Sequence, residues 1–330
     1  MNPARTIQAS HEGAISMAAE ILRRGGLVVF PTETVYGLGA DACNPIAVAR
    51  IFEVKRRPAI DPLIVHVADE ESARSYGEIP DKWAPALMGK FWPGPLTLVV
   101  RKRPIVPSIV TAGLDTVAIR VPAHPVAQEL IRASETAVAA PSANPFGYVS
   151  PTMAEHIQGE QFDHIDLLLD GGACEVGLES TIVSLVGPSP LILRAGGISV
   201  EEIAQALELN SVHISAKSHP FPESPGQLAR HYATLTPLVI VPDDDWAAFL
   251  CSGEKVGLLT LKPPCSSERF ASVEVLSETG DLREAAANLF AAMRRLDALG
   301  LTRIIAAPIP EKGLGIAIMD RLRRCAARKA

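Results

Sequence analysis

The amino-acid sequence predicts an α/β fold in two domains, on the basis of three observations. With 330 residues, the chain is longer than a typical single domain. Apolar runs typical of strands alternate with segments of helical periodicity along most of its length. At residues 213–237 this alternation stops, because proline and glycine there are too frequent for regular structure. We therefore expect one domain at 1–210, a linker at 211–236 and a smaller α/β domain at 237–330.

The first domain begins with a helix at 12–24, which Gly25 and Gly26 end. Its last helix, 200–207, begins at Ser199, and Glu202 completes a capping box. The other expected helices are 45–54, 69–76, 81–91 and 125–133. The expected strands are 27–30, 63–67, 96–100, 117–121, 137–140, 167–169, 181–186 and 191–193.

The second domain shows the same alternation of short strands and helices. We expect strands at 238–241, 256–261, 273–276 and 303–306, and helices at 243–250, 281–299 and 315–327. Because helices separate the strands, the pattern favours a parallel, Rossmann-like sheet.

Composition limits the classes of protein to consider. Hydrophobic residues form 48% of the chain, enough for a sizeable core, and the net charge of −6 argues against non-specific binding of nucleic acid. The five cysteines are scattered without a Cys-x-x-Cys pair, which fits a reduced protein without structural zinc. The chain lacks a signal-peptide core and any membrane-length apolar run. We expect a cytoplasmic protein with no membrane partner.

Polar side chains are concentrated directly after the strand at 27–30, in the stretch Pro31-Thr32-Glu33-Thr34-Val35-Tyr36-Gly37-Leu38-Gly39. Hydroxyl groups on an extended segment, with glycines just after them, suit a small polar ligand that lies close to the backbone. The alternative is a strand, a turn and a second strand, in which the threonines are present only because they favour β-structure.

This stretch resembles the signature of the YrdC-like family, the threonylcarbamoyl-AMP synthases. Further similarities follow in family order along nearly the whole chain: Lys55-Arg56-Arg57-Pro58, Asp61 to His66, Ala140 to Asn144, Ser150-Pro151-Thr152, Gly177 to Val183, Leu193 to Gly196, Ser224 to Tyr232 and Gly313 to Leu322. The last two are similar to the long, two-domain branch. The resemblance implies a YrdC-like twisted-sheet catalytic domain that condenses L-threonine, bicarbonate or CO₂, and ATP into threonylcarbamoyl-AMP with release of pyrophosphate.

The resemblance also implies site residues and partners. Threonine would be bound by Thr34, His66, Arg120, Ala140 and Ser180. ATP, with Mg²⁺, would be bound by Lys55, Arg57, Asp61, Thr116, Ser142, Asn144, Ser150, Arg194 and Tyr232. Lys55 and Arg57 would be catalytic through their charge. The metal ligands stay unassigned. The family usually has Asn at the position of Asp61, and this carboxylate could sit near magnesium. The product would pass to a threonylcarbamoyl transferase that acts on tRNA, with weak or absent tRNA binding by this chain.

Four of these residues allow another interpretation from the sequence itself. Cations at the end of a helix, such as Lys55 and Arg57, are favoured by the helix dipole even without a phosphate. A histidine inside an apolar strand, such as His66, is more often a core residue than a ligand. Arg120 also lies in an apolar strand and needs an anion, either a ligand carboxylate or one of the 37 acidic side chains of the chain.

The linker motif and the C-terminal motif receive different interpretations. Arg230, His231 and Tyr232 together could cover a nucleotide by charge and stacking, so we hypothesise that 224–232 forms a lid over ATP. The alternative is a plain tether. The motif at 313–322 is an amphipathic helix with a glycine entry, and we expect no catalytic role for it.

Two other classes of function were weighed. An RNA-binding module is disfavoured by the acidic net charge. A carbamoyl transferase like the related domains of hydrogenase-maturation proteins would carry zinc-finger and acylphosphatase segments, which this sequence does not show. The chain has no Gly-x-x-x-x-Gly-Lys-Ser/Thr loop, so it has no P-loop nucleotide site.

Overall fold

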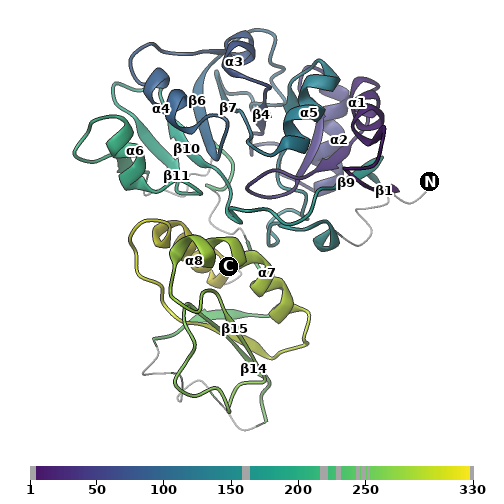
Figure 1. Cartoon of the computed structure of the whole chain (residues 1–330). Coiled ribbons are helices and arrows are strands. Elements are labelled where there is room, and N and C mark those ends of the chain that lie inside the picture. Colours follow the sequence, from purple (N-terminus) through teal and green to yellow (C-terminus); the bar gives the residue numbers. More distant parts are fainter. Residues whose placement is uncertain are drawn as a thin grey trace.

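The structure is a computed structural model that describes residues 5–157, 164–215, 222–227, 232–242, 246, 250 and 253–327. It has a larger N-terminal and a smaller C-terminal α/β domain (Figure 1). Most of the expected helix at 243–250, together with Arg230 and His231, lies outside the described residues.

The N-terminal domain is built on one mixed, 12-stranded sheet, and each strand that the sequence predicted there is present. The strands are β1 (Arg5–Gln8), β2 (Val28–Phe30), β3 (Gly37–Asp41), β4 (Ile64–His66), β5 (Gly77–Glu78), β6 (Leu96–Lys102), β7 (Thr116–Arg120), β8 (Val138–Ala139), β9 (Leu167–Asp170), β10 (Thr181–Ser184), β11 (Leu191–Arg194) and β12 (His213–Ile214). Their order in space is β1-β9-β2-β3-β8-β4-β7-β6-β10-β11-β12, and β5 pairs with β6.

Helices cover the two faces of this sheet unequally. They are α1 (Ala14–Arg23), α2 (Pro45–Lys55), α3 (Glu70–Tyr76), α4 (Ala84–Phe91), α5 (Pro125–Ser134), the short 3₁₀ helix η1 (Ala154–His156) and α6 (Val200–Ala206). One core lies between the sheet and α2, α3, α4 and α6, while α1 and α5 pack on the other face over β1, β9 and β2. Asn44 caps α2, and the capping box expected from Ser199 and Glu202 begins α6.

The C-terminal domain has a four-stranded sheet in which each pairing is parallel, as the sequence predicted. Its strands are β13 (Leu238–Ile240), β14 (Val256–Thr260), β15 (Ser272–Val275) and β16 (Arg303–Ala306), in the order β13-β16-β14-β15. Its helices are α7 (Leu282–Asp297) and α8 (Gly315–Ala326). Both helices lie on the side of this domain that faces the N-terminal domain (Figure 1).

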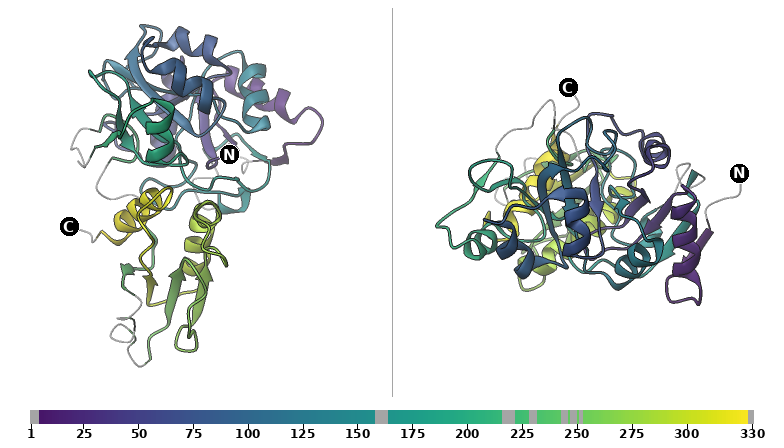
Figure 2. Two further views of the ribbon diagram at one scale, coloured as in Figure 1. Left: turned by 60° about the vertical axis from the view of Figure 1, so that its left-hand side comes forward. Right: turned by 90° about the horizontal axis from the view of Figure 1, so that it is seen from above.

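The two domains share a hydrophobic core, and the left view of Figure 2 shows that α7 and α8 lie on the side of the C-terminal domain next to the N-terminal domain. The N-terminal domain contributes Val35, Val149, Leu178 and Ala195, and these pack with residues of α7 and α8. Contact is so close at Gly177 that a Cβ atom there would lie 2.5 Å from a backbone oxygen of α7. The domains are therefore docked through close-packed side chains, with the linker between them.

Candidate active site

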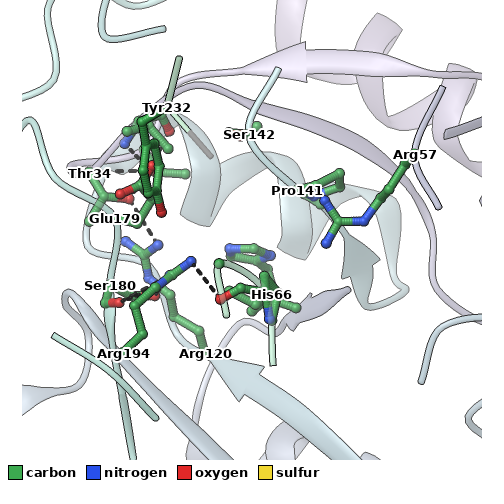
Figure 3. Close-up of a pocket in the computed structure, with 17 residues that line it drawn as sticks. Thr34, Arg57, His66, Arg120, Pro141, Ser142, Glu179, Ser180, Arg194 and Tyr232 are labelled. Atoms are coloured by element: carbon green, nitrogen blue, oxygen red, sulfur yellow. Dashed lines mark hydrogen bonds between the residues drawn. The ribbon is translucent and has the colours of Figure 1, made fainter. Parts of the chain in front are cut away.

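A pocket opens on the face of the N-terminal sheet opposite the α2, α3, α4 and α6 core, next to the C-terminal domain. Its lining residues come from distant parts of the chain: Thr32, Thr34, Val35, Gly37, Arg57, Ile64, His66, Arg120, Ala140, Pro141, Ser142, Glu179, Ser180, Arg194, Pro225, Gly226 and Tyr232. The cavity of about 50 Å³ holds a few water molecules at about 10–15 Å³ each. Figure 3 shows Arg57 on one side, Arg194 and Tyr232 on the other, and His66 between them.

Arg120 forms the floor of the pocket and is held by three bonds. Its Nη2 lies 2.6 Å from Oε1 of Glu33, its Nη1 donates to Oγ1 of Thr34 at 2.9 Å, and its Nε donates to the carbonyl of Gly94 at 3.1 Å. Glu33 also accepts a bond from the backbone N–H of Ala123 at 3.0 Å. The anion that the buried strand arginine requires is thus supplied by the motif at 31–39.

The hydroxyl groups of this motif mainly shape their own loop. The Oγ1 atoms of Thr32 and Thr34 lie 2.8 Å apart, and the Thr32 hydroxyl donates to the carbonyl of Val35 at 2.7 Å. Gly39 is needed for packing, since a Cβ atom there would lie 2.7 Å from the ring of Phe30. The motif therefore presents Thr34 to the pocket from a rigid turn.

Arg194 forms the wall nearest the linker. Its Nε and Nη2 donate to the carbonyl of Ser180 at 3.2 and 3.0 Å, and Nη2 also donates to the Ser180 hydroxyl at 3.1 Å. Its Nη1 donates to the carbonyl of Pro225 at 3.3 Å. Burial lowers the pKa of Arg194, but a guanidinium stays charged in proteins. This arginine joins the sheet to the linker across the pocket.

The three cations of the basic motif lie in different places: Arg57 lies in the pocket, Lys55 lies behind it, and Arg56 is exposed. Arg57 lines the pocket and forms an ion pair with Asp61, with Nη2 and Oδ2 2.9 Å apart. Lys55 is buried under the loop at 142–144, where its Nζ donates to the carbonyls of Ser142 and Asn144, both at 2.5 Å. Burial lowers the pKa of Lys55 well below its usual value and raises that of Asp61. In this structure Lys55 braces a pocket loop, and Asp61 faces Arg57.

His66 is buried at the centre of the pocket. It stands beside Arg120 in the parallel register of β4 and β7, and its ring contacts the Phe30 ring edge-on at 6.3 Å. Burial, followed by the charge of Arg120, lowers the pKa of His66 to about 3. His66 is therefore a neutral imidazole near pH 7, and it adds no positive charge to the pocket.

Tyr232 covers the pocket from the linker. Its side chain is 0% exposed and stacks on Phe290 of α7, with ring centroids 5.6 Å apart and planes at 21°. The pocket wall beside it includes Glu179, which accepts a bond from the Ser150 hydroxyl at 2.6 Å. The pocket is lined by residues of the N-terminal domain and the linker, and the C-terminal domain supports Tyr232 from behind through Phe290.

Most of the residues that the sequence marked for a site converge here, and some lie elsewhere. Thr34, Arg57, His66, Arg120, Ala140, Ser142, Ser180, Arg194 and Tyr232 line the pocket. Asn144 and Ser150 are buried behind its wall, while Thr116 stands at the far end of β7, paired with Arg101. Four residues on one strand span about 13 Å, so sharing a face with Arg120 does not bring Thr116 into the pocket.

Several pocket residues were missed by the sequence analysis. Glu179, Pro225, Gly226 and Thr32 line the cavity without having been assigned to it. Glu179 carried a usable signal, because an acid within an apolar stretch requires a cationic partner in the same way as Arg120 does.

The donor set suits anions and offers little to a resident metal. Among the residues that the structure describes, no group of three or more His, Cys, Asp or Glu side chains could hold a metal ion. The carboxylates of Glu33, Asp61 and Glu179 each lie against an arginine. Magnesium often binds through substrate phosphates with one or two carboxylates, so these residues fit Mg²⁺ only as an ion carried by a nucleotide.

The mixed sheet with an arginine-lined pocket, followed by a parallel α/β domain, defines a YrdC-like protein of the two-domain type. A family model described as "Telomere recombination" matches residues 20–196, and one described as "Threonylcarbamoyl-AMP synthase, C-terminal domain" matches 198–327. The chain belongs to the threonylcarbamoyl-AMP synthase family.

Named relatives match along nearly the full length. The threonylcarbamoyl-AMP synthases of Pyrococcus abyssi and Bacillus subtilis are 43% and 40% identical to the chain, and the matches cover 95% and 96% of it and 94% of each relative. The crystal structure of P. abyssi Sua5 complexed with L-threonine matches with a TM-score of 0.90 at 40% identity, over 98% of both chains. Among the described residues, none of the helices is long and apolar enough to cross a membrane.

Proposed function

We propose that this chain is an L-threonylcarbamoyladenylate synthase, which condenses L-threonine, bicarbonate or CO₂, and ATP into threonylcarbamoyl-AMP and pyrophosphate. The observation that carries the proposal is the convergence of Arg57, Arg120 and Arg194 on one enclosed pocket. Three guanidinium groups around a cavity favour a ligand that carries both a carboxylate and phosphates. The solved relative that was crystallised with L-threonine supports threonine as one substrate.

Threonine would bind at the Arg120 end of the pocket. The three bonds of Arg120 to described residues use three of its five N–H groups, so two are available for a substrate carboxylate. Thr34, His66, Ala140 and Ser180 surround this position and would select the amine and hydroxyl of the substrate.

Mg·ATP would bind between Arg57 and Arg194. The present cavity of about 50 Å³ is far too small for a nucleotide, so the segment with Pro225, Gly226 and Tyr232 must move aside to admit it. Arg57 would then exchange its contact with Asp61 for a phosphate contact. Lys55 would act from behind the loop at 142–144, where Ser142 lines the pocket.

The chemistry follows from positioning and charge neutralisation. The neutral amine of threonine adds to CO₂ and loses a proton, which gives a carbamate; from bicarbonate, that proton leaves together with the bicarbonate hydroxyl group as water. A carbamate oxygen then forms a bond to the α-phosphorus of ATP. At the same time, the bond between the α-phosphorus and the oxygen that bridges the α- and β-phosphates breaks. Pyrophosphate leaves with the electron pair. The arginines stabilise the charge on the phosphates, and the covering linker excludes water from the acyl-adenylate. The product would then pass to a transferase that modifies tRNA.

Release of pyrophosphate tests the proposal when threonine, bicarbonate and ATP are omitted one at a time. We expect release only with all three, together with a product of the mass of threonylcarbamoyl-AMP, because the carbamate must exist before the phosphorus is attacked. Release at the full rate without threonine would contradict the proposal.

A further inference from the structure

Helix α8 of the C-terminal domain reaches the pocket wall through Arg321. This side chain is 0% exposed although it carries a charge. Its Nε donates to Oε2 of Glu179 at 3.1 Å, and its Nη2 donates to the carbonyl of Ala195 at 2.9 Å. Both acceptors belong to the N-terminal domain. Its Nη1 donates to Asp320 at 2.7 Å, within its own helix.

Glu179 connects Arg321 with the pocket. One carboxylate oxygen faces Arg321, and the other accepts the bond from Ser150. Glu179 lines the pocket, next to Ser180, which Arg194 holds. The orientation of this carboxylate is thus set from one side by the C-terminal domain.

Tyr232 is the second pocket residue that Arg321 contacts. The Arg321 guanidinium carbon lies 4.9 Å from the centre of the Tyr232 ring, and Phe290 of α7 stacks on that ring. The backbone of Tyr232 has φ of 64°, a left-handed conformation that residues other than glycine adopt at a cost. The side chains packed around Tyr232 must therefore hold its backbone in this conformation. Two of them, Arg321 and Phe290, belong to the C-terminal domain.

We propose that Arg321 is a positioning residue of the active site, which holds Glu179 and Tyr232 in the pocket wall. The C-terminal domain then supplies part of the nucleotide-binding site, beyond being joined to the catalytic domain. The identity of the nucleotide rests on the proposed function; the positioning of the two side chains does not.

A merely structural role explains Arg321 poorly. A buried ion pair contributes little net stability, because desolvation offsets the attraction, and apolar side chains of similar volume are often as stable. Other parts of this interface are closed by such apolar side chains, including Val35, Leu178 and Phe290. What an apolar residue could not do is orient a carboxylate and attract the face of an aromatic ring.

Full-length variants test the proposal by calorimetric titration with Mg·ATP and, separately, with L-threonine. We expect Arg321→Met to weaken Mg·ATP binding at least about tenfold, with threonine affinity changed less than about twofold. Arg321→Lys should recover only part of the loss, because an ammonium lacks the planar fork. The control is Arg323→Met on the same helix, since Arg323 is exposed and pairs with Glu311 inside the C-terminal domain. It should bind both ligands as wild type.

A second variant separates positioning from damage to the fold. In Arg321→Met the buried carboxylate of Glu179 loses its cation, and adding Glu179→Gln removes that unpaired charge. We expect the double variant to regain the wild-type unfolding temperature while Mg·ATP binding stays weak. Recovery of Mg·ATP binding together with the unfolding temperature would overturn the proposal. Unchanged Mg·ATP affinity in a folded Arg321→Met protein would also overturn it.

Hydrogen exchange tests the positioning part without any ligand. The N–H of Ala233, next to Tyr232, donates to the carbonyl of Gly147 at 2.8 Å. We expect this amide to exchange faster in Arg321→Met than in Arg323→Met. If the wild-type protein binds neither Mg·ATP nor threonine, the proposed function fails. The positioning role of Arg321 is then tested by hydrogen exchange at Ala233 alone. Equal exchange rates in the two variants would overturn that role.

Discussion

The guanidinium of Arg120 and the carboxylate of Glu33 form a buried ion pair in the pocket, with Nη2 and Oε1 2.6 Å apart. Arg120 is 3% exposed and Glu33 is 5% exposed. The pair removes the need for a ligand to neutralise Arg120, yet it fixes the guanidinium so that its remaining N–H groups are pre-organised. The first prediction follows from this pair.

Replacing Arg120 alone would confuse two effects. Arg120→Ala leaves Glu33 buried without a cation, which typically costs about 3–5 kcal/mol of stability. We therefore expect the double variant Arg120→Ala with Glu33→Gln to be the more stable of the two. Its affinity for threonine should fall roughly tenfold to a hundredfold, the usual result of losing a charged hydrogen bond, with a smaller change for ATP. Calorimetric titration checks both, and unchanged threonine affinity in the folded double variant would make Arg120 purely structural.

A feature of this region could be predicted when its signal lies within one segment of the sequence. It could not be predicted when it depends on two distant segments coming together. The apolar strand around Arg120 showed that this arginine needs an anion. Its partner Glu33 could not be chosen, because 87 residues separate it from Arg120 and only the fold brings the two segments together. Lys55 is different: Ala47, Ile51 and Lys55 follow one another at helical i+4 spacing and are all buried. This spacing is visible in the sequence alone. It indicates that Lys55 faces the protein interior and is not part of an exposed basic cap.

The second prediction concerns pH. The pKa of His66 is about 3 in the folded protein, against about 6.5 when unfolded, so the unfolded state binds a proton that the folded state does not between these values. Stability must therefore fall as pH falls below about 6.5. From pH 7 to pH 5 the expected loss is about 2 kcal/mol from His66 alone.

Urea unfolding of wild type and His66→Gln at pH 7 and pH 5 checks this. The variant should lose less stability on acidification, because its side chain does not titrate. Some dependence should stay, since burial also lowers the pKa of His156, to about 4. Equal losses in the two proteins would show that His66 does not titrate as inferred.

The third prediction concerns Gly226, which lines the pocket with φ of 87°. A Cβ atom there would lie 3.0 Å from Cδ of Arg194 and 3.2 Å from the Tyr232 hydroxyl oxygen. Gly113 has nearly the same φ, 82°, but its Cβ would meet no atom within 4 Å. We expect Gly226→Ala and Gly113→Ala each to suffer the cost of about 1–2 kcal/mol for a left-handed residue with a side chain.

Only Gly226→Ala should also raise the KM for ATP, because its methyl group pushes on two residues of the pocket. Steady-state kinetics on both variants separates the two effects. Equal kinetics would mean that the segment around Gly226 does not touch the bound nucleotide.

The role of the C-terminal domain was the least predictable part of the site. The sequence identified 313–322 as an amphipathic helix, and α8 confirms the helix (Figure 1). Arg321 is one of three arginines in α8. Its burial depends on how α8 docks against the other domain, and no local pattern in α8 encodes that docking. The available hint was that Arg321 precedes Leu322 and lies two and three residues after Met319 and Ile318, since these three residues are all buried.

The last prediction is that the linker around Tyr232 acts as a lid. Removing everything after residue 210 is a poor test, because truncation would expose the core shared by the domains, including Val35 and Leu178. Tyr232→Ala in the full chain is sharper: it removes the stack on Phe290 and one wall of the pocket. We expect this variant to bind threonine normally, to bind ATP about tenfold more weakly, and to form more AMP than threonylcarbamoyl-AMP for the pyrophosphate released. Water that enters the open pocket would hydrolyse the intermediate to AMP and the carbamate, which breaks down to threonine and bicarbonate.

Tyr232→Phe is the matched control for this experiment. It keeps the ring that stacks on Phe290 and that Arg321 contacts, so it should retain most of the ATP affinity and the product yield. The measurement is the ratio of threonylcarbamoyl-AMP to pyrophosphate over time, since a lid protects the intermediate whereas a tether has no influence on it. If Tyr232→Ala makes the same ratio as Tyr232→Phe and binds ATP as tightly, the linker only tethers the two domains, and the small cavity must open for ATP by another movement.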